Sequence, residues 1–197
     1  MFLVLAVATV TGANGTERTI VVLGDSLSSG YGLGGEKSWV TLLEDRLRAE
    51  AYGYKVVNAS IAGDTSSGGL ARLPKLLSDY QPAIVIVELG GNDGLRGQPP
   101  AQLRRNLEEI IDLAQAAGAK TLLTGIQIPP NYGPAYTEQF ADVYTEVAGE
   151  TESPLVGFLM DGVALHPELM QGDRMHPNAR GQEPMLDNVW PVLAEML

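Results

Sequence analysis

Hydrophobic residues follow two alternating patterns along the chain. Short runs that are apolar almost without a break predict buried strands, and the clearest is PAIVIVELGGND at 82–93. Segments with apolar residues three or four positions apart predict amphipathic helices, as in 38–51, where Leu43 and Leu47 are four apart. We expect strands at 18–24, 82–93, 119–129 and 154–160, and a strand with its exit at 54–63. We expect helices at 38–51, 70–80, 100–118, 135–150 and 181–197.

Residues at the ends of several helical patterns support these boundaries. Ser38 is a suitable N-cap for the first expected helix, because its hydroxyl can accept a hydrogen bond from a free backbone N–H group. Gly118 is a suitable stop for the third. Pro74 lies within 70–80, and we expect it in or near the first turn of that helix, where proline is tolerated.

The alternation of strands and helices predicts a fold. Strands joined through helices run parallel, with right-handed crossovers and helices on both faces. The prediction is an α/β, three-layer α/β/α sandwich of flavodoxin-like type with a five-stranded parallel sheet. The length of 197 residues favours one domain. Ligand sites in such sheets lie outside the carboxyl ends of the strands, so motifs at those ends carry the functional information.

Charge and cysteine content narrow the classes of function. The net charge of -11 disfavours binding to nucleic acid or to an anionic membrane surface, and suits a small-molecule substrate. The absence of cysteine excludes disulfides, thiolate catalysis and cysteine-based zinc sites. Two histidines are too few for a typical multi-histidine metal site. We therefore expect no metal. We also expect no cofactor and a monomeric protein.

The first fifteen residues have a separate character. They are apolar from Phe2 to Val10 and then small and polar, which resembles the core and cleavage region of a signal peptide, although the positively charged start is missing. The run is too short for a membrane span, which needs about 20 apolar residues. The alternatives are a first buried strand or an ordinary N-terminal helix. We predict that 1–15 is a signal-peptide remnant or accessory segment, that 16–197 is the domain, and that the protein is periplasmic or secreted.

The end of the first expected strand, VVLGDSLSSGYG, allows two interpretations: a serine nucleophile or a glycine-rich phosphate site. Gly30, Gly32 and Gly35 match the G-x-G-x-x-G pattern of dinucleotide-binding proteins. That pattern must follow the strand at once and be accompanied by an acid at the end of the second strand. Neither condition is met, which disfavours a bound dinucleotide.

Ser26 alone would be assigned to a turn or a helix cap, and the G-x-S-x-G motif of many hydrolases is absent. Three further segments change this interpretation. Together with the serine segment they resemble, in order, the four sequence blocks of the GDSL (SGNH) hydrolase family: GDSLSSGYG, NASIAGDTSSGG, VELGGNDGLRG and DRMHPN. The resemblance covers nearly the whole chain after about residue 17. The runs GGLARLP and NYGP are similar to the bacterial multifunctional thioesterase, lysophospholipase and arylesterase group of that family.

The resemblance implies a set of catalytic residues. Ser26 would be the nucleophile, and Asp173 and His176 would complete a triad. The backbone N–H of Ser26, the N–H of Gly63 and the amide of Asn92 would form the oxyanion hole. The sequence departs from the family pattern at Ser29, where alanine is common, and at Arg174, where glycine is common; neither position supplies a catalytic group.

The two histidines are distinguished by their surroundings. A serine hydroxyl needs an adjacent base, and either imidazole could serve. Asp173 lies three residues before His176, a spacing that lets one turn bring carboxylate to imidazole, whereas Asp161 lies five before His166. We therefore interpret His176 as the base and His166 as a structural or surface histidine at a helix start.

Other charged residues near the strand ends have simpler interpretations. Asp25 and Asp93 are expected to orient loops through hydrogen bonds to the backbone. Arg72 and Arg96 could attract an anionic substrate group, but exposed helix or loop arginines are the favoured interpretation.

The glycine- and proline-rich segments 94–100 and 129–134 are expected to flank an acyl pocket as mobile loops. The substrate-binding candidates that they supply are Gly94, Leu95, Arg96, Tyr132 and Pro134.

The sequence thus predicts a serine hydrolase that cleaves carboxylic esters and acyl thioesters through an acyl-enzyme on Ser26. One alternative within the same family is a carbohydrate acetylesterase. An alternative from another class is a flavodoxin-like module that binds a phosphate ligand at the same edge of the sheet without hydrolysing esters.

Overall fold

The computed structural model describes residues 17–197. Its centre is a five-stranded sheet in which every pairing is parallel, in the order β2-β1-β3-β4-β5. The strands are β1 (Arg18–Gly24), β2 (Tyr54–Asn58), β3 (Ile84–Glu88), β4 (Lys120–Thr124) and β5 (Leu155–Val156). The predicted five-stranded parallel sheet is confirmed.

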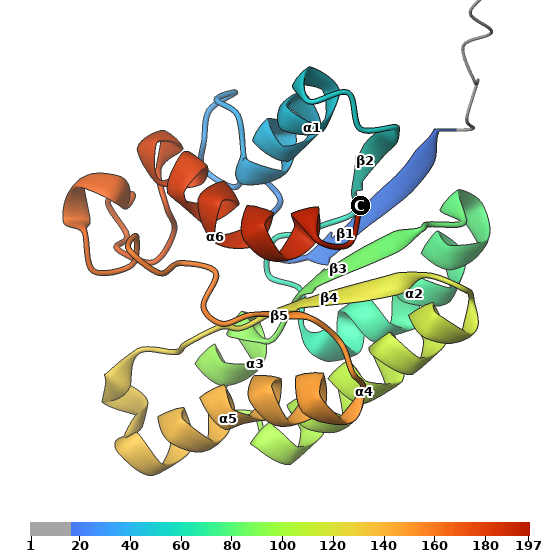
Figure 1. Cartoon of the computed structure of the whole chain (residues 1–197). Helices are drawn as coiled ribbons and strands as arrows, with labels where there is room; N and C mark the ends of the chain where they lie inside the picture. The colour runs from blue at the N-terminus through green and yellow to red at the C-terminus, as the bar shows by residue number, and fades with distance from the viewer. Residues whose placement is uncertain (1–16) are drawn as a thin grey trace, which may run out of the picture.

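Helices cover both faces of this sheet (Figure 1). They are α1 (Trp39–Ala49), α2 (Ser66–Tyr80), the short α3 (Gly91–Leu95), α4 (Pro100–Ala116), α5 (Pro134–Glu150) and α6 (Gln182–Ala194). The helices α1 and α6 lie on one face, and α2, α4 and α5 on the other. The three-layer α/β/α sandwich is therefore as predicted.

Each face has its own hydrophobic core, which explains the unbroken apolar run in β3. Side chains of a strand alternate between faces. Ile84 and Ile86 pack with the core that contains Trp39, while Val85 and Val87 pack with the core that contains Phe140. These four side chains are buried, as is that of Glu88 at the end of the strand. A strand covered on both faces needs apolar residues at every position, so alternation disappears from its sequence.

The second helix begins earlier than its pattern suggests. It starts at Ser66 instead of residue 70, so that Pro74 lies in its interior and not in or near the first turn. The Thr65 hydroxyl caps the helix by accepting a hydrogen bond from Gly68 N (3.2 Å). A Cβ at Gly69 would stand 2.2 Å from Leu89, so close packing, and not helix propensity, requires glycine here.

The first strand has its predicted bounds, and β2 ends at Asn58, before the exit that 54–63 includes. The strands in 82–93, 119–129 and 154–160 are shorter than predicted and end at Glu88, Thr124 and Val156. In 82–93 and 119–129, buried residues beyond the strand ends caused the overestimate: Leu89, Ile126 and Ile128 pack in the core without pairing in the sheet. The last part of 82–93 is the first turn of α3, so Asn92 lies on a short helix.

The order of the strands determines where a ligand can bind. β1 pairs with both β2 and β3, so the chain winds in opposite directions from this point of the sheet. In open parallel sheets the crevice at such a switch point is the usual ligand site. The segments that leave β1 and β3 there carry Ser26 and Asn92.

The predictions for 1–15 lie outside the described residues. Within residues 17–197, no helix is both long and apolar enough to cross a membrane.

Candidate active site

The turn after β1 holds Ser26 at the carboxyl edge of the sheet. Asp25 N donates a hydrogen bond to Glu88 Oε2 (3.1 Å), which ties this turn to the end of β3. Leu27 N donates to Asp25 Oδ1 (3.0 Å). A Cβ on Gly24 would stand 2.7 Å from Glu88 Oε2, so glycine permits the close approach of the two strand ends. Asp25 orients the loop, as predicted.

Ser26, His176 and Asp173 form a continuous chain of hydrogen bonds. Ser26 Oγ lies 2.9 Å from His176 Nε2, across 150 residues of sequence. His176 Nδ1 lies 2.7 Å from Asp173 Oδ2. The ring of Tyr31 packs on the imidazole, with 4.6 Å between ring centroids. The structure thus brings together the three residues that the sequence singled out as a triad.

The carboxylate of Asp173 determines the tautomer of the histidine. Hydrogen bonds from the His176 side chain and from the backbone N–H groups of Met175 and His176 lower the pKa of Asp173 to about 2. An ionised carboxylate can only accept, so Nδ1 carries the proton that it receives. Nε2 is then free to accept from the Ser26 hydroxyl, which is the arrangement a general base requires.

Gly63 and Asn92 lie beside the serine but are not equivalent. Gly63 has a φ of 82°, a conformation that favours glycine. Asn92 Nδ2 donates to Asp25 Oδ2 (2.9 Å) and to Asp64 O (2.8 Å). Both of its protons therefore have acceptors, and an oxyanion would have to replace one of them.

A cavity of about 1150 Å³ opens at Ser26. Its walls are mainly apolar, with Leu95, Ile126, Ile128, Phe158 and Met160 among the lining residues. Ser26, Gly63, Asn92, Asp173 and His176 also line it. The hydrogen-bonded triad thus stands in the wall of a large apolar space.

The comparisons with known proteins agree with this geometry. The model of the GDSL-like lipase/acylhydrolase family matches residues 22–183. The chain belongs to this family. It is an acylhydrolase, and the family resemblance of its four sequence blocks is confirmed.

Several members of this acylhydrolase family are similar over most of their length. Esterase TesA of Pseudomonas aeruginosa is 53% identical over 180 residues, covering 91% of this chain and 90% of TesA. Thioesterase 1/protease 1/lysophospholipase L1 of Escherichia coli is 46% identical over 182 residues, 92% of this chain and 84% of the relative. A crystal structure of TesA matches with a TM-score of 0.89 and 53% identity, over 91% of this chain and 100% of that one.

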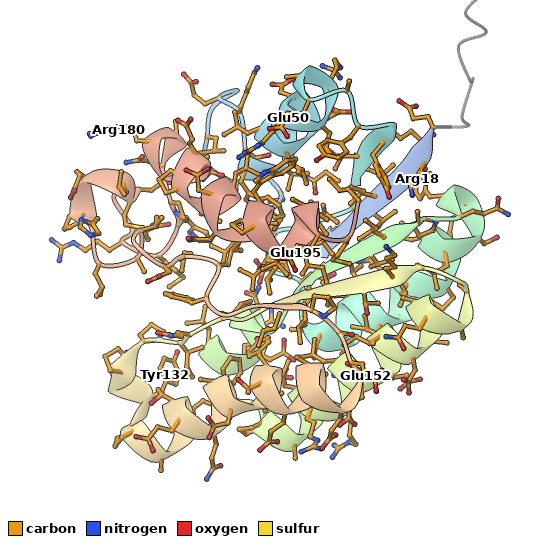
Figure 2. All side chains as sticks on the ribbon, viewed as in Figure 1. Arg18, Glu50, Tyr132, Glu152, Arg180 and Glu195 are labelled. Atoms are coloured by element: carbon orange, nitrogen blue, oxygen red, sulfur yellow. The ribbon has the colours of Figure 1, made fainter. Side chains whose placement is uncertain are left out.

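The predicted substrate-binding residues of the acylhydrolase are mostly not in the cavity wall. Leu95 is the one candidate that lines it. Gly94 is buried against Ile128 and Phe140. Tyr132, on the segment that enters α5 (Figure 2), donates through its hydroxyl to Leu95 O (2.8 Å), and Pro134 is the first residue of α5. Gly94 and Tyr132 thus contact the wall residues Ile128 and Leu95 without lining the cavity themselves.

The two arginines near the strand ends, Arg72 and Arg96, donate hydrogen bonds to backbone carbonyl groups. Arg72 is only partly exposed and bonds to Asp64 Oδ2 (2.8 Å), Gly24 O (3.3 Å) and the carbonyl of Ala59. Arg96 is exposed and donates to Gly63 O (3.0 Å). The interpretation of Arg72 as an exposed helix residue is wrong, because its guanidinium fastens the exits of β1 and β2 to α2. In the sequence, only the position of Arg72 within the run GGLARLP points to this role.

A buried carboxyl pair lies behind the nucleophile, which the sequence did not reveal. Burial raises the pKa of Asp25 to about 6. Burial, followed by the charge of Asp25, raises the pKa of Glu88 well above its usual range, which favours its protonated form. Ser28 Oγ donates to Glu88 Oε2 (2.6 Å) and accepts from Trp39 Nε1 (3.2 Å). This chain of contacts joins β3, the serine loop and α1.

His166 lies in the wall of the same cavity, which its interpretation as a structural or surface histidine did not include. It precedes a short 3-10 helix at Pro167–Leu169, and its Nδ1 lies 3.3 Å from Glu168 Oε1. Within residues 17–197 no group of three or more acids and histidines is placed to hold a metal ion.

Proposed function

We propose that this acylhydrolase cleaves carboxylic esters and acyl thioesters through an acyl-enzyme on Ser26. The observation that carries the proposal is the hydrogen-bonded chain Ser26 Oγ–His176 Nε2 (2.9 Å) and His176 Nδ1–Asp173 Oδ2 (2.7 Å) in the wall of an apolar cavity. A neutral hydroxyl is a weak nucleophile, and a base at hydrogen-bond distance activates it.

The proposed reaction has two stages. In the first, Ser26 Oγ attacks the acyl carbon while His176 Nε2 takes the hydroxyl proton. His176 then gives that proton to the departing alcohol or thiol, and the acyl group stays on Ser26. In the second stage, water gives a proton to His176 and attacks the acyl carbon, and the proton returns to Ser26 as the carboxylic acid leaves. Asp173 stabilises the charged imidazolium throughout.

The negative charge on the attacked carbonyl oxygen needs donors fixed in advance. The N–H groups of Ser26 and Gly63 and the amide of Asn92 are the proposed donors, since Gly63 and Asn92 line the cavity beside the serine. Arg96 and Arg72 support this site indirectly, because Arg96 donates to Gly63 O, and Arg72 donates to the side chain of Asp64 and to the carbonyl of Ala59.

The size and polarity of the cavity favour substrates with an acyl chain. Relatives are named esterase, arylesterase, thioesterase and lysophospholipase, which are activities on acyl esters and thioesters. Apolar walls stabilise a bound chain by about 0.8 kcal/mol per buried methylene. An acetylated carbohydrate would leave these walls largely uncovered, so the acetylesterase alternative is less favoured.

A graded panel of 4-nitrophenyl esters, with matched N-acetylcysteamine thioesters, tests this proposal. We expect kcat/KM to rise at least about tenfold from acetyl to octanoyl, because added methylenes replace water against the cavity wall. Acetylated sugars should be poor substrates. A highest kcat/KM on acetylated sugars would contradict the acyl-chain proposal, while no turnover of any ester would contradict the function itself.

Replacement of Asn92 by alanine tests the oxyanion site. We expect kcat to fall by about 10²–10³-fold with little change in KM, because the lost donor acts mainly on the transition state. The variant also leaves Asp25 Oδ2 without its donor, so its melting temperature must be measured to show that it is folded. A change confined to KM would mean that Asn92 only holds the substrate.

The periplasmic or secreted location, the monomeric state and the boundary at residue 16 remain predictions from the sequence. They rest on the apolar start of the chain and on its composition.

A further inference from the structure

Arg174 occupies an unusual backbone conformation in the wall of the cavity. Its φ is 58°, in the left-handed region that side chains with a Cβ disfavour. It lies between Asp173 and Met175, two residues before His176, and all four line the cavity. Strained backbone clusters at functional sites, so this conformation points to a use for the Arg174 side chain.

The guanidinium of Arg174 is unpaired in the part of the chain that the structure describes. Among the described residues it makes no ion pair or side-chain hydrogen bond, and it is the only lysine or arginine that lines the cavity. The neighbouring carboxylate of Asp173 is occupied by His176 and two backbone N–H groups. An exposed cation is thus available to a substrate in a protein whose net charge is -11.

We propose that Arg174 is a specificity-determining residue that binds a phosphate group on the leaving group of the substrate. This inference rests on the proposed function. His176 must protonate the departing oxygen or sulfur, so the leaving group lies on the His176 side of Ser26. Arg174 is part of the same turn, which the bonds from Arg174 N to Gln171 O and from Gln171 N to His176 O close. The planar guanidinium suits phosphate, to which it can donate two parallel hydrogen bonds.

Two kinds of substrate carry this chemistry. One is a single-chain phospholipid, whose phosphate lies on the glycerol leaving group. The other is an acyl thioester of a phosphorylated pantetheine, whose leaving group is a thiol. The apolar wall would hold the acyl chain of either, while Arg174 would select the phosphate.

Matched pairs of substrates test the proposal. One pair is lauroyl lysophosphatidic acid and monolauroylglycerol, and the other is lauroyl-4′-phosphopantetheine and lauroyl-pantetheine. The readout is the ratio of kcat/KM for the phosphorylated member to that for the neutral member. In Arg174→Gly and Arg174→Ala we expect this ratio to fall about fivefold to tenfold in at least one pair, the size of one exposed charge contact. The pair that responds identifies the source of the phosphate.

Two further variants separate charge from backbone strain. Arg174→Lys should keep part of the ratio, because it keeps the charge but cannot donate two parallel hydrogen bonds. Arg180→Ala is the matched control, since Arg180 lies outside the cavity wall and its side chain extends away from the body of the molecule (Figure 2). Arg174→Gly should also raise the melting temperature, because glycine relieves the left-handed backbone; this shows that any lost activity is not lost folding.

Added salt should lower the ratio in the unmodified protein but not in Arg174→Ala. An unchanged ratio in both pairs for Arg174→Ala would overturn the proposal and leave the proposed function intact. An equal loss on phosphorylated and neutral members would also overturn it, since Arg174 would then act on the triad. If the unmodified protein cleaved the 4-nitrophenyl esters but no member of either pair, the inference would fall and the proposed function would stand.

Discussion

Ser26→Ala should lower kcat at least about 10⁴-fold for every ester that the protein cleaves, and should abolish labelling by a fluorophosphonate probe. Alanine removes the only atom of the residue that contacts His176, at 2.9 Å, and leaves the backbone N–H in place. No acyl-enzyme can form, so the remaining rate comes from substrate binding and from the oxyanion donors alone. Mass spectrometry of the labelled protein checks the loss of labelling, and steady-state kinetics check the loss of kcat.

Ser29→Ala is the matched control for this variant. Ser29 stands in the same loop and does not line the cavity. It should keep both labelling and activity. Labelling that persists in Ser26→Ala, or that disappears in Ser29→Ala, would show that the nucleophile has been assigned to the wrong residue.

His176→Ala should cost about as much as loss of the serine, at least about 10⁴-fold in kcat, because members of a triad act as a unit. His166→Ala should cost less than about tenfold. Both histidines line the same cavity, but only His176 reaches Ser26; the ring of His166 lies against Glu168. Steady-state kinetics with one neutral ester distinguish the two variants.

The comparison is informative because each histidine precedes a proline and each has an acid nearby in the sequence. The melting temperatures of the two variants should be compared, since His176 N and O also take part in the turn that holds Asp173. An inactive His166→Ala together with an active His176→Ala would contradict the proposed triad.

The fold and the triad could be predicted because they depend on local patterns and on spaced motifs. Strands buried on both faces leave unbroken apolar runs, and these runs led to the central strands; all five strands were found. The end of β1 was predicted correctly, but the ends of β3 and β4 were not, because Leu89 and Ile126 are buried by packing beyond the sheet, and sequence does not distinguish pairing from packing. The start of α2 was missed for the opposite reason: Gly68 and Gly69 weaken the helix signal, although Gly69 is needed for contact with Leu89.

The residues behind the site were harder to predict, because each acts through contacts that are distant in sequence. Arg72 reaches carbonyls at Gly24 and Ala59, and its spacing within α2 resembles that of a surface residue. Glu88 ends an apolar strand and looks like the first solvent-facing position, yet it is fully buried against Asp25 and Ser28. The cavity wall was hard to predict for the same reason, since residues 126–130 and 158–166 meet only in the folded chain.

The separation of 150 residues between Ser26 and His176 also has a consequence for biosynthesis. The serine leaves the ribosome early, with β1, but its base follows all five strands, and α6 must still cover the core around Trp39. Contacts between distant parts of a chain form slowly, because a long loop must close before they contribute. An unfinished or truncated chain therefore carries the nucleophile without its base. During refolding, hydrolytic activity should return only after most of the helical circular dichroism signal has recovered.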